Sequence, residues 1–144
     1  DADVQALIIP DLPLNEYEAN YKDVFNEFGI SKIFLITPQT SKERINKIDE
    51  LSDSFIYMVS SSSITGGRKG ISRQQTDYFN RIKNMNLKNP VLTGFGISDK
   101  ESFDTACRYS SGAIIGSAFI NAVSESGDLE TKVKRFVKSI KNRS

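Results

Sequence analysis

The chain has 144 residues, with 19 Lys and Arg against 18 Asp and Glu, a single cysteine and no histidine. The net charge of +1 argues against binding to nucleic-acid phosphates, and the lack of histidine excludes Ser-His-Asp or Cys-His nucleophile pairs and imidazole zinc sites. No apolar run approaches the roughly 20 residues that span a bilayer, so we expect a soluble, cytoplasmic α/β protein that binds neither membrane nor nucleic acid.

Five short β-like runs recur along the chain. The first follows almost directly on Asp1-Ala2-Asp3, a beginning without an initiator methionine that is typical of a chain starting inside a larger fold. The first three runs are almost continuously apolar, which indicates strands buried on both faces of a parallel sheet. The five predicted strands are Ala6–Pro10, Ile33–Thr37, Phe55–Ser60, Val91–Phe95 and Ala113–Gly116.

Segments of helical period separate the runs. The first carries apolar residues from Tyr17 to Phe28 and is followed by Gly29, a predicted left-handed helix cap. Two patterns, Thr40 with Glu43 and Ser98 with Glu101, predict capping boxes at later helix starts. Two further apolar stripes predict amphipathic helices: Tyr78, Phe79, Ile82 and Met85, and then Leu129, Val133, Phe136, Val137 and Ile140.

This alternation amounts to five consecutive βα units. Parallel strands joined by helices form either an open doubly wound sheet or a (β/α)₈ barrel. Because crossovers are right-handed and sequential strands usually neighbour one another, we expect a curved parallel sheet in the order 1-2-3-4-5.

Glycines follow three of the predicted strands. They lie in Ser63–Gly67, Gly94–Ser98 and Gly116–Ala118. Glycine lets a backbone approach a ligand closely and direct N–H groups at an anion. The stretch 116–124 is expected to form a short helix whose positive end adds to such a site, as in the phosphate sites of (β/α)₈ barrels.

Four motifs, in order and spacing, resemble the tryptophan synthase α-subunit family: Ile9–Pro13 (IPDLP), Ser63–Gly66 (SITG), Gly94–Ser98 (GFGIS) and Gly116–Ala118 (GSA). The resemblance covers essentially the whole chain but only the C-terminal half, or slightly more, of that family's barrel. It implies a single domain over residues 1–144 that forms part of a (β/α)₈ TIM barrel, with the five units as strands 4 to 8. Such a fragment would leave two sheet edges, at the first and last predicted strands.

The family's activity is the retro-aldol cleavage of indole-3-glycerol phosphate to indole and glyceraldehyde 3-phosphate, a carbon–carbon lyase step of tryptophan biosynthesis that uses no metal or cofactor. By the resemblance, backbone N–H groups bind the substrate phosphate and Thr65 acts in loop closure. The implied phosphate-binding residues are Gly66, Gly96, Gly116 and Ser117, and the implied indole pocket is Ile8, Leu35, Tyr57, Phe95 and Ile114.

The family's partner is a pyridoxal-phosphate-dependent β subunit in an αββα heterotetramer, and the resemblance places Asp11 and Pro13 at that interface. The family's catalytic glutamate and aspartate belong to the second strand and the loop after it, upstream of this chain. Asp11 matches neither, so we expect the 144-residue fragment alone to be inactive. Two alternatives stay open: a non-catalytic phosphate-binding half-barrel, and another phosphate-binding TIM-barrel aldolase or epimerase, against which the Thr65-Gly66 pair argues.

Overall fold

The computed structural model describes residues 3–60, 72–94 and 96–141. Its strands form one sheet in the order β1-β2-β3-β4-β5, and each neighbouring pair is parallel. The predicted order is therefore confirmed, and it does not reverse midway as a doubly wound sheet would. The strands are β1 (Ala6–Ile8), β2 (Ser31–Ile36), β3 (Ile56–Val59), β4 (Val91–Gly94) and β5 (Gly112–Ala113).

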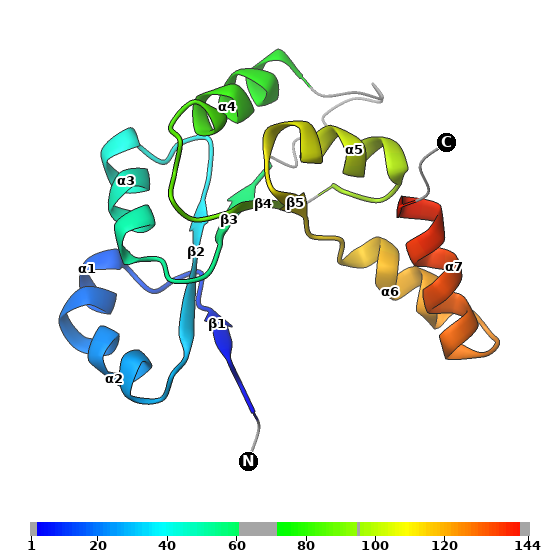
Figure 1. The fold of residues 1–144 in the computed structure, drawn as a ribbon, viewed down its shortest axis with the longest axis horizontal. Helices are drawn as coiled ribbons and strands as arrows, with labels where there is room; N and C mark the ends of the chain where they lie inside the picture. Colours follow the sequence, from blue (N-terminus) through cyan, green and yellow to red (C-terminus); the bar gives the residue numbers. More distant parts are fainter. Residues whose placement is uncertain (1–2, 61–71, 95, 142–144) are drawn as a thin grey trace.

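Helices surround this sheet in an open arc, with α1 and α2 beside β2 at one end and α6 and α7 beyond β5 at the other (Figure 1). The predicted short helix after the fifth strand is present as a separate element ahead of the last helix. The helical elements are α1 (Leu14–Glu16), the π-helical turn η1 (Tyr17–Tyr21), α2 (Lys22–Glu27), α3 (Lys42–Leu51), α4 (Arg73–Lys83), α5 (Lys100–Tyr109), α6 (Ser117–Ser124) and α7 (Leu129–Lys141).

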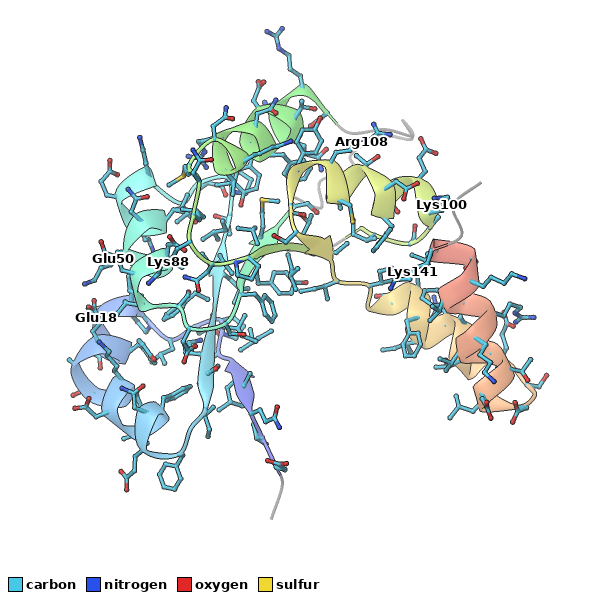
Figure 2. All side chains as sticks on the ribbon, viewed as in Figure 1. Glu18, Glu50, Lys88, Lys100, Arg108 and Lys141 are labelled. Carbon is cyan, nitrogen blue, oxygen red and sulfur yellow. The ribbon has the colours of Figure 1, made fainter. Side chains whose placement is uncertain are left out.

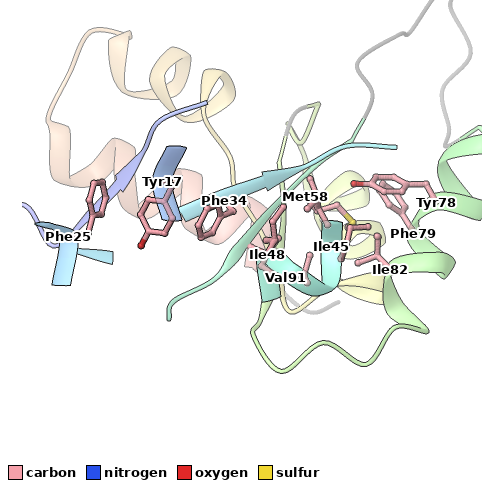
Figure 3. Packing of buried hydrophobic residues seen from close by; sticks show 12 residues of the cluster. Tyr17, Phe25, Phe34, Ile45, Ile48, Met58, Tyr78, Phe79, Ile82 and Val91 are labelled. Atoms are coloured by element: carbon pink, nitrogen blue, oxygen red, sulfur yellow. The ribbon is translucent and has the colours of Figure 1, made fainter. Parts of the chain in front are cut away.

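The hydrophobic core lies between the sheet and the helices that cover its outer face (Figure 3). Since side chains alternate across a strand, every second residue of β2, β3 and β4 points at these helices. Ile36, Ile56 and Met58 are completely buried there. Three of the four residues in the stripe predicted for α4, Tyr78, Phe79 and Ile82, belong to the core, whereas Met85 follows the end of the helix and is only partly buried against it. From the other helices the core takes Tyr17, Phe25, Ile45 and Ile48.

The opposite face of the sheet, which we call the inner face, carries the alternate residues. The ladder pairs Ile8 with Ile33, Leu35 with Tyr57, and Leu92 with Gly112. No helix in the described ranges is packed over this face in Figure 1.

The structure corrects the predicted first βα unit. Strand β1 is three residues long and largely exposed rather than buried on both faces, because it is the sheet's edge. The helical stripe after it is interrupted by η1, which changes the angular spacing. Tyr17 and Phe25 are therefore buried, whereas Tyr21, Val24 and Phe28 are exposed. Gly29, at φ +62°, does adopt the predicted left-handed conformation.

Both predicted capping boxes are wrong by one residue. Helix α3 is capped by Ser41, whose hydroxyl accepts from the Arg44 N–H at 3.3 Å, while Thr40 accepts from the Thr37 N–H. Helix α5 is capped by Asp99 in a reciprocal box with Ser102. Serine, threonine and aspartate are all favourable N-caps. The choice between adjacent candidates therefore depends on which residue occupies the extended conformation just before the helix begins.

Charged side chains project from the outside of the helices (Figure 2). Several of them tie loops to neighbouring helices. The Lys88 ammonium donates to the Glu50 carbonyl at 3.1 Å, and the Asp49 carboxylate accepts from the backbone N–H groups of Lys88 and Asn89. These contacts hold the loop that connects α4 to β4 against the end of α3.

Candidate functional site

The turn after β4 has the geometry expected of a ligand-binding glycine loop. Gly96 has φ +75°, a left-handed conformation that side chains rarely adopt, and among the described residues other than its chain neighbours no heavy atom lies within 4 Å of the position a Cβ would take. The strand end before it is held firmly, because the Gly94 carbonyl accepts from both the N–H and the hydroxyl of Ser60, at 3.1 and 2.8 Å. Gly96 thus follows a strand end that is held in place by Ser60.

Helix α6 begins at the end of the neighbouring strand. Its N-cap is Gly116, which has no side chain to cap the first-turn N–H groups, and a Cβ built there also meets open space. Because β4 and β5 are adjacent and parallel, their carboxyl ends lie at the same edge of the sheet. Gly96, Gly116 and Ser117 are thereby brought to one edge, where a helix N-terminus favours an anion.

The orientation of α6 is set by α7. The Lys132 ammonium donates to the carbonyls of Val123 and Glu125 at 2.7 and 2.6 Å, at the carboxyl end of α6. The Arg135 guanidinium pairs with the Glu125 carboxylate at 2.7 Å, and the rings of Phe119 and Phe136 meet edge to face. A cation at a helix C-terminus also stabilises that helix by complementing its dipole.

The predicted indole-pocket residues that the structure describes share the inner face. Strand pairing places Ile8, Leu35 and Tyr57 on it, and Ile114 follows β5 with its N–H donating to the Thr93 carbonyl of β4 at 2.8 Å. Ile8 is exposed, and the other three are half-buried. The Tyr57 ring lies against Gly94, so that a Cβ at this position would overlap the ring. Partial burial raises the pKa of the Tyr57 hydroxyl further above neutral pH.

A tight turn follows β1 at the same edge of the sheet. The Leu12 N–H donates to the Ile9 carbonyl at 3.3 Å, and Pro10 and Asp11 form the corner of the turn. Asp11 and Pro13 are exposed there. The predicted interface residues are thus on an accessible turn at the carboxyl end of the edge strand.

Thr65, Gly66 and Phe95 lie outside the described residues, so their predicted roles stay predictions. Among residues 3–60, 72–94 and 96–141, no three His, Cys, Asp or Glu side chains gather as metal ligands. In the same ranges no helix has the length and apolar character needed to cross a membrane.

A cleft of about 380 Å³ lies at the opposite end of the sheet. Val91, at the amino end of β4, and Ser111, which precedes β5, contribute to its lining together with the last turns of α4 and α5. None of the predicted site residues borders it. In barrels of this type the amino-terminal face of the sheet supports stability and the carboxyl-terminal face carries the chemistry, so we place the candidate site at the strand carboxyl ends.

Two residues that shape this site escaped the sequence reasoning. Ser60 ends the third predicted strand, but nothing in the sequence indicates that its hydroxyl donates to the Gly94 carbonyl, 34 residues away. Lys132 lies on the predicted last amphipathic helix, outside its apolar stripe. Lys132 lies within one turn of the start of α7, so its side chain can reach back to the preceding helix. Its position near the start of the predicted helix is the sequence feature that could have indicated this contact.

The family model for the tryptophan synthase alpha chain matches residues 1–143. The tryptophan synthase alpha chain of Flavobacterium johnsoniae is 54% identical over 138 residues, covering 96% of this chain and 54% of its own length. That of Flavobacterium psychrophilum is 53% identical over 137 residues, covering 95% and 53%. The chain thus spans about half the length of the curated relatives it matches.

Solved structures give the same likeness. A chain of the tryptophan synthase α₂β₂ complex from Pyrococcus furiosus superposes with a TM-score of 0.78 at 30% identity, covering 95% of this chain and 55% of that one. The tryptophan synthase alpha chain of Legionella pneumophila gives a TM-score of 0.77 at 26% identity, covering 95% and 50%. The predicted α/β fold, five βα units of a TIM barrel, is confirmed by these neighbours and by the strand order.

Proposed function

This chain belongs to the tryptophan synthase alpha chain family, and from that premise we propose that the natural protein containing it cleaves indole-3-glycerol phosphate to indole and glyceraldehyde 3-phosphate. The observation that carries the proposal is the pairing of Gly96 with the N-terminus of α6 at one edge of the sheet. That arrangement suits a phosphate ester, and the apolar inner face beside it suits an aromatic ring.

Substrate binding divides into two parts. The phosphate is bound by backbone N–H groups at Gly96, Gly116 and Ser117, with Gly66 of the preceding loop as a fourth contributor. The indole ring lies on the inner face, against Ile8, Leu35, Tyr57, Phe95 and Ile114. Binding the two ends of the substrate separately holds the bond between the ring and the glycerol chain at a fixed place, where catalytic groups act on it.

The reaction breaks the carbon–carbon bond between indole C3 and the glycerol chain. The ring carbon gains a proton, and the adjacent hydroxyl loses one as it becomes the aldehyde, so acidic side chains are needed on both sides. The family's two catalytic carboxylates match no position of this chain. We therefore propose that residues 1–144 supply the phosphate and part of the indole site but do not catalyse cleavage alone, and that Thr65 acts in loop closure.

We further propose a β-subunit partner that carries pyridoxal phosphate, in an αββα assembly in the cytoplasm, with Asp11 and Pro13 at the contact. The support is the likeness to the α₂β₂ complex of Pyrococcus furiosus together with the exposure of the turn after β1. No cofactor is proposed for this subunit.

Glycerol phosphate titration of a Gly96→Val variant tests the phosphate site. Valine at φ +75° places bulk where the ligand approaches, so we expect affinity to fall by about tenfold or more. Gly127→Val is a matched control, because Gly127 also has a positive φ, +117°, and open space around it, but it lies in the α6–α7 loop at the far end of α6. Equal affinity of a folded Gly96→Val variant and the wild type would contradict the site.

A second experiment separates the enzyme from the alternative of a non-catalytic half-barrel. Residues 1–144 and the natural protein are compared for cleavage of indole-3-glycerol phosphate and for glycerol phosphate binding. We expect binding in both and cleavage in the natural protein only. Cleavage by residues 1–144 would show that a carboxylate of this chain performs the chemistry, with Asp11 as the first residue to substitute.

A further inference from the structure

Lys32 is a buried lysine on the outer face of β2. Its side chain is 3% exposed, and its ammonium lies 5.5 Å from the centroid of the Phe34 ring. Within the described residues it forms no ion pair with a carboxylate, and burial lowers its pKa. An ammonium removed from water in this way needs compensating hydrogen bonds.

Those hydrogen bonds go to backbone carbonyls. The Lys32 Nζ donates to the Ile9 carbonyl at 3.0 Å and to that of Ile33 at 3.4 Å. The Ile9 carbonyl is the same group that accepts from the Leu12 N–H and so closes the turn after β1. Two donors therefore converge on the single acceptor that defines the turn, and one of them comes from the neighbouring strand.

The turn is fixed at both sides of its corner. Before the corner, the Ile9 carbonyl is tied to β2 through Lys32. After it, the Leu12 side chain packs against the hydrophobic core. Asp11, between these two anchors, remains exposed. The carboxylate thus projects from a backbone whose direction is set by the sheet.

We propose that Lys32 is a positioning residue, whose ammonium holds the Ile9–Leu12 turn in the conformation in which Asp11 engages the β subunit. This inference rests on the proposed function, because that function places the partner at Asp11. A segment ordered before binding loses less conformational freedom on binding, which increases affinity. Lys32 contributes to affinity in this way without touching the partner.

A role in stability alone explains Lys32 less well. A buried charge has a large desolvation cost, and replacing buried ionic groups by apolar residues of similar volume is often neutral or stabilising. Methionine would fill the same space beside Phe34 without that cost. What methionine lacks is a donor for the Ile9 carbonyl, so the lysine matters for the geometry of the turn.

The test compares Lys32→Met with Lys47→Met in the natural protein. Lys47 is an exposed lysine paired with Glu18 on the surface of the same fold, and its substitution controls for loss of a charge. We expect Lys32→Met to weaken affinity for the β subunit roughly tenfold, as loss of a charge-assisted hydrogen bond predicts. The KM for indole-3-glycerol phosphate stays within twofold, hydrogen exchange of the Leu12 amide accelerates, and Lys47→Met changes none of the three.

Other results overturn the proposal. A folded Lys32→Met variant with unchanged β-subunit affinity does so, even if Leu12 exchange accelerates, because the turn then has no role in docking. If that variant does not fold, Lys32→Gln retains a neutral donor and is measured in the same way. Fast exchange of the Leu12 amide in the wild-type protein overturns the proposal without any variant, since the turn would not be ordered before binding.

An Asp11→Asn variant separates this inference from the function on which it rests. If Asp11→Asn weakens β-subunit affinity and Lys32→Met does not, the positioning role alone is wrong. If neither substitution changes affinity, the partner does not bind at this turn, and the proposed interface is wrong as well.

Discussion

The middle of the sheet and its two flanks differ sharply in how well they are buried. In the middle, Ile36, Ile56 and Met58 are fully buried under α3 and α4. At the flanks, Phe28 at the end of α2 is 69% exposed, and Ile120 of α6 is 60% exposed. Other large apolar side chains exposed at the flanks are Val4, Leu7, Ile8, Ile9, Tyr21, Val24, Leu129 and Val137.

The apolar side chains of the middle are thus buried within this chain, whereas those of the flanks remain exposed. Isolated exposed apolar residues are ordinary on a protein surface, but groups of them at the ends of one sheet mark places where further burial is available. The middle strands obtain their stability from contacts within residues 3–141. The exposed apolar side chains of the flanks gain further stability only when something else covers them.

The largest expected effect is a cavity in the middle. Ile56→Ala should lower the free energy of unfolding by about 2–5 kcal/mol, because a fully buried side chain loses both its transfer free energy and its neighbours' contacts. Ile120→Ala, at the exposed flank, should change it by less than about 0.5 kcal/mol. Urea denaturation of residues 1–144 measures both. A similar loss at the two sites would show that the flank is covered there.

The second effect concerns the contact between β3 and β4 on the inner face. Gly94→Ala places a methyl group against the Tyr57 ring and should cost about 1–3 kcal/mol through overpacking. Tyr57→Leu removes the ring, so the cost of Gly94→Ala should shrink in the Tyr57→Leu background. A double-mutant cycle by urea denaturation measures this coupling, and strictly additive effects would contradict the contact.

A smaller effect is expected from the cap of α4, the helix that covers the middle. Ser72 accepts from the Gln75 N–H, while the Gln75 side chain accepts from the Ser72 N–H at 2.9 Å. Ser72→Ala should therefore destabilise the protein by about 1 kcal/mol. Ser139→Ala is the control, since that exposed hydroxyl only donates to a carbonyl within α7. Thermal unfolding compares the two, and equal shifts in Tm would argue against the capping box.

The smallest expected effect is at the cap of α7, on the C-terminal flank, and it should depend on pH. The Asp128 carboxylate accepts from the Thr131 N–H at 2.8 Å at the start of α7, and this hydrogen bond lowers its pKa below the usual 3.8. The charged form is therefore favoured in the folded state. The contribution of the Asp128 carboxylate to the free energy of unfolding is complete above its unfolded-state pKa. It is lost as the pH falls through its folded-state pKa. Urea denaturation should show Asp128→Ala to be mildly destabilising at pH 7 and progressively less so as the pH falls below 3.8. An effect that does not change with pH would exclude this cap.

Local sequence features predicted much of the fold because they act within one element. Five apolar runs at βα spacing predicted five strands in the observed order, and the periodicity of α4 predicted its buried stripe. Glycine at positions 29 and 116 correctly marked a helix end and a helix start. Exact strand ends and caps were less predictable, since adjacent residues such as Ser98 and Asp99 compete for the same cap.

Only the tertiary structure decided the features that join distant parts of the chain. These features are three long-range hydrogen bonds: from Ser60 to the Gly94 carbonyl, from Lys32 to the Ile9 carbonyl, and from Lys132 to a carbonyl at the end of α6. A serine or lysine has the same local signature whether it is solvated or buried against a carbonyl far along the chain, so periodicity and spacing carry no sign of such contacts. The sequence by itself determined which elements form and their order, because propensity, capping and apolar spacing are local. The burial of each face and the orientation of each strand-end turn depend on which elements meet, and that is a property of the packed sheet.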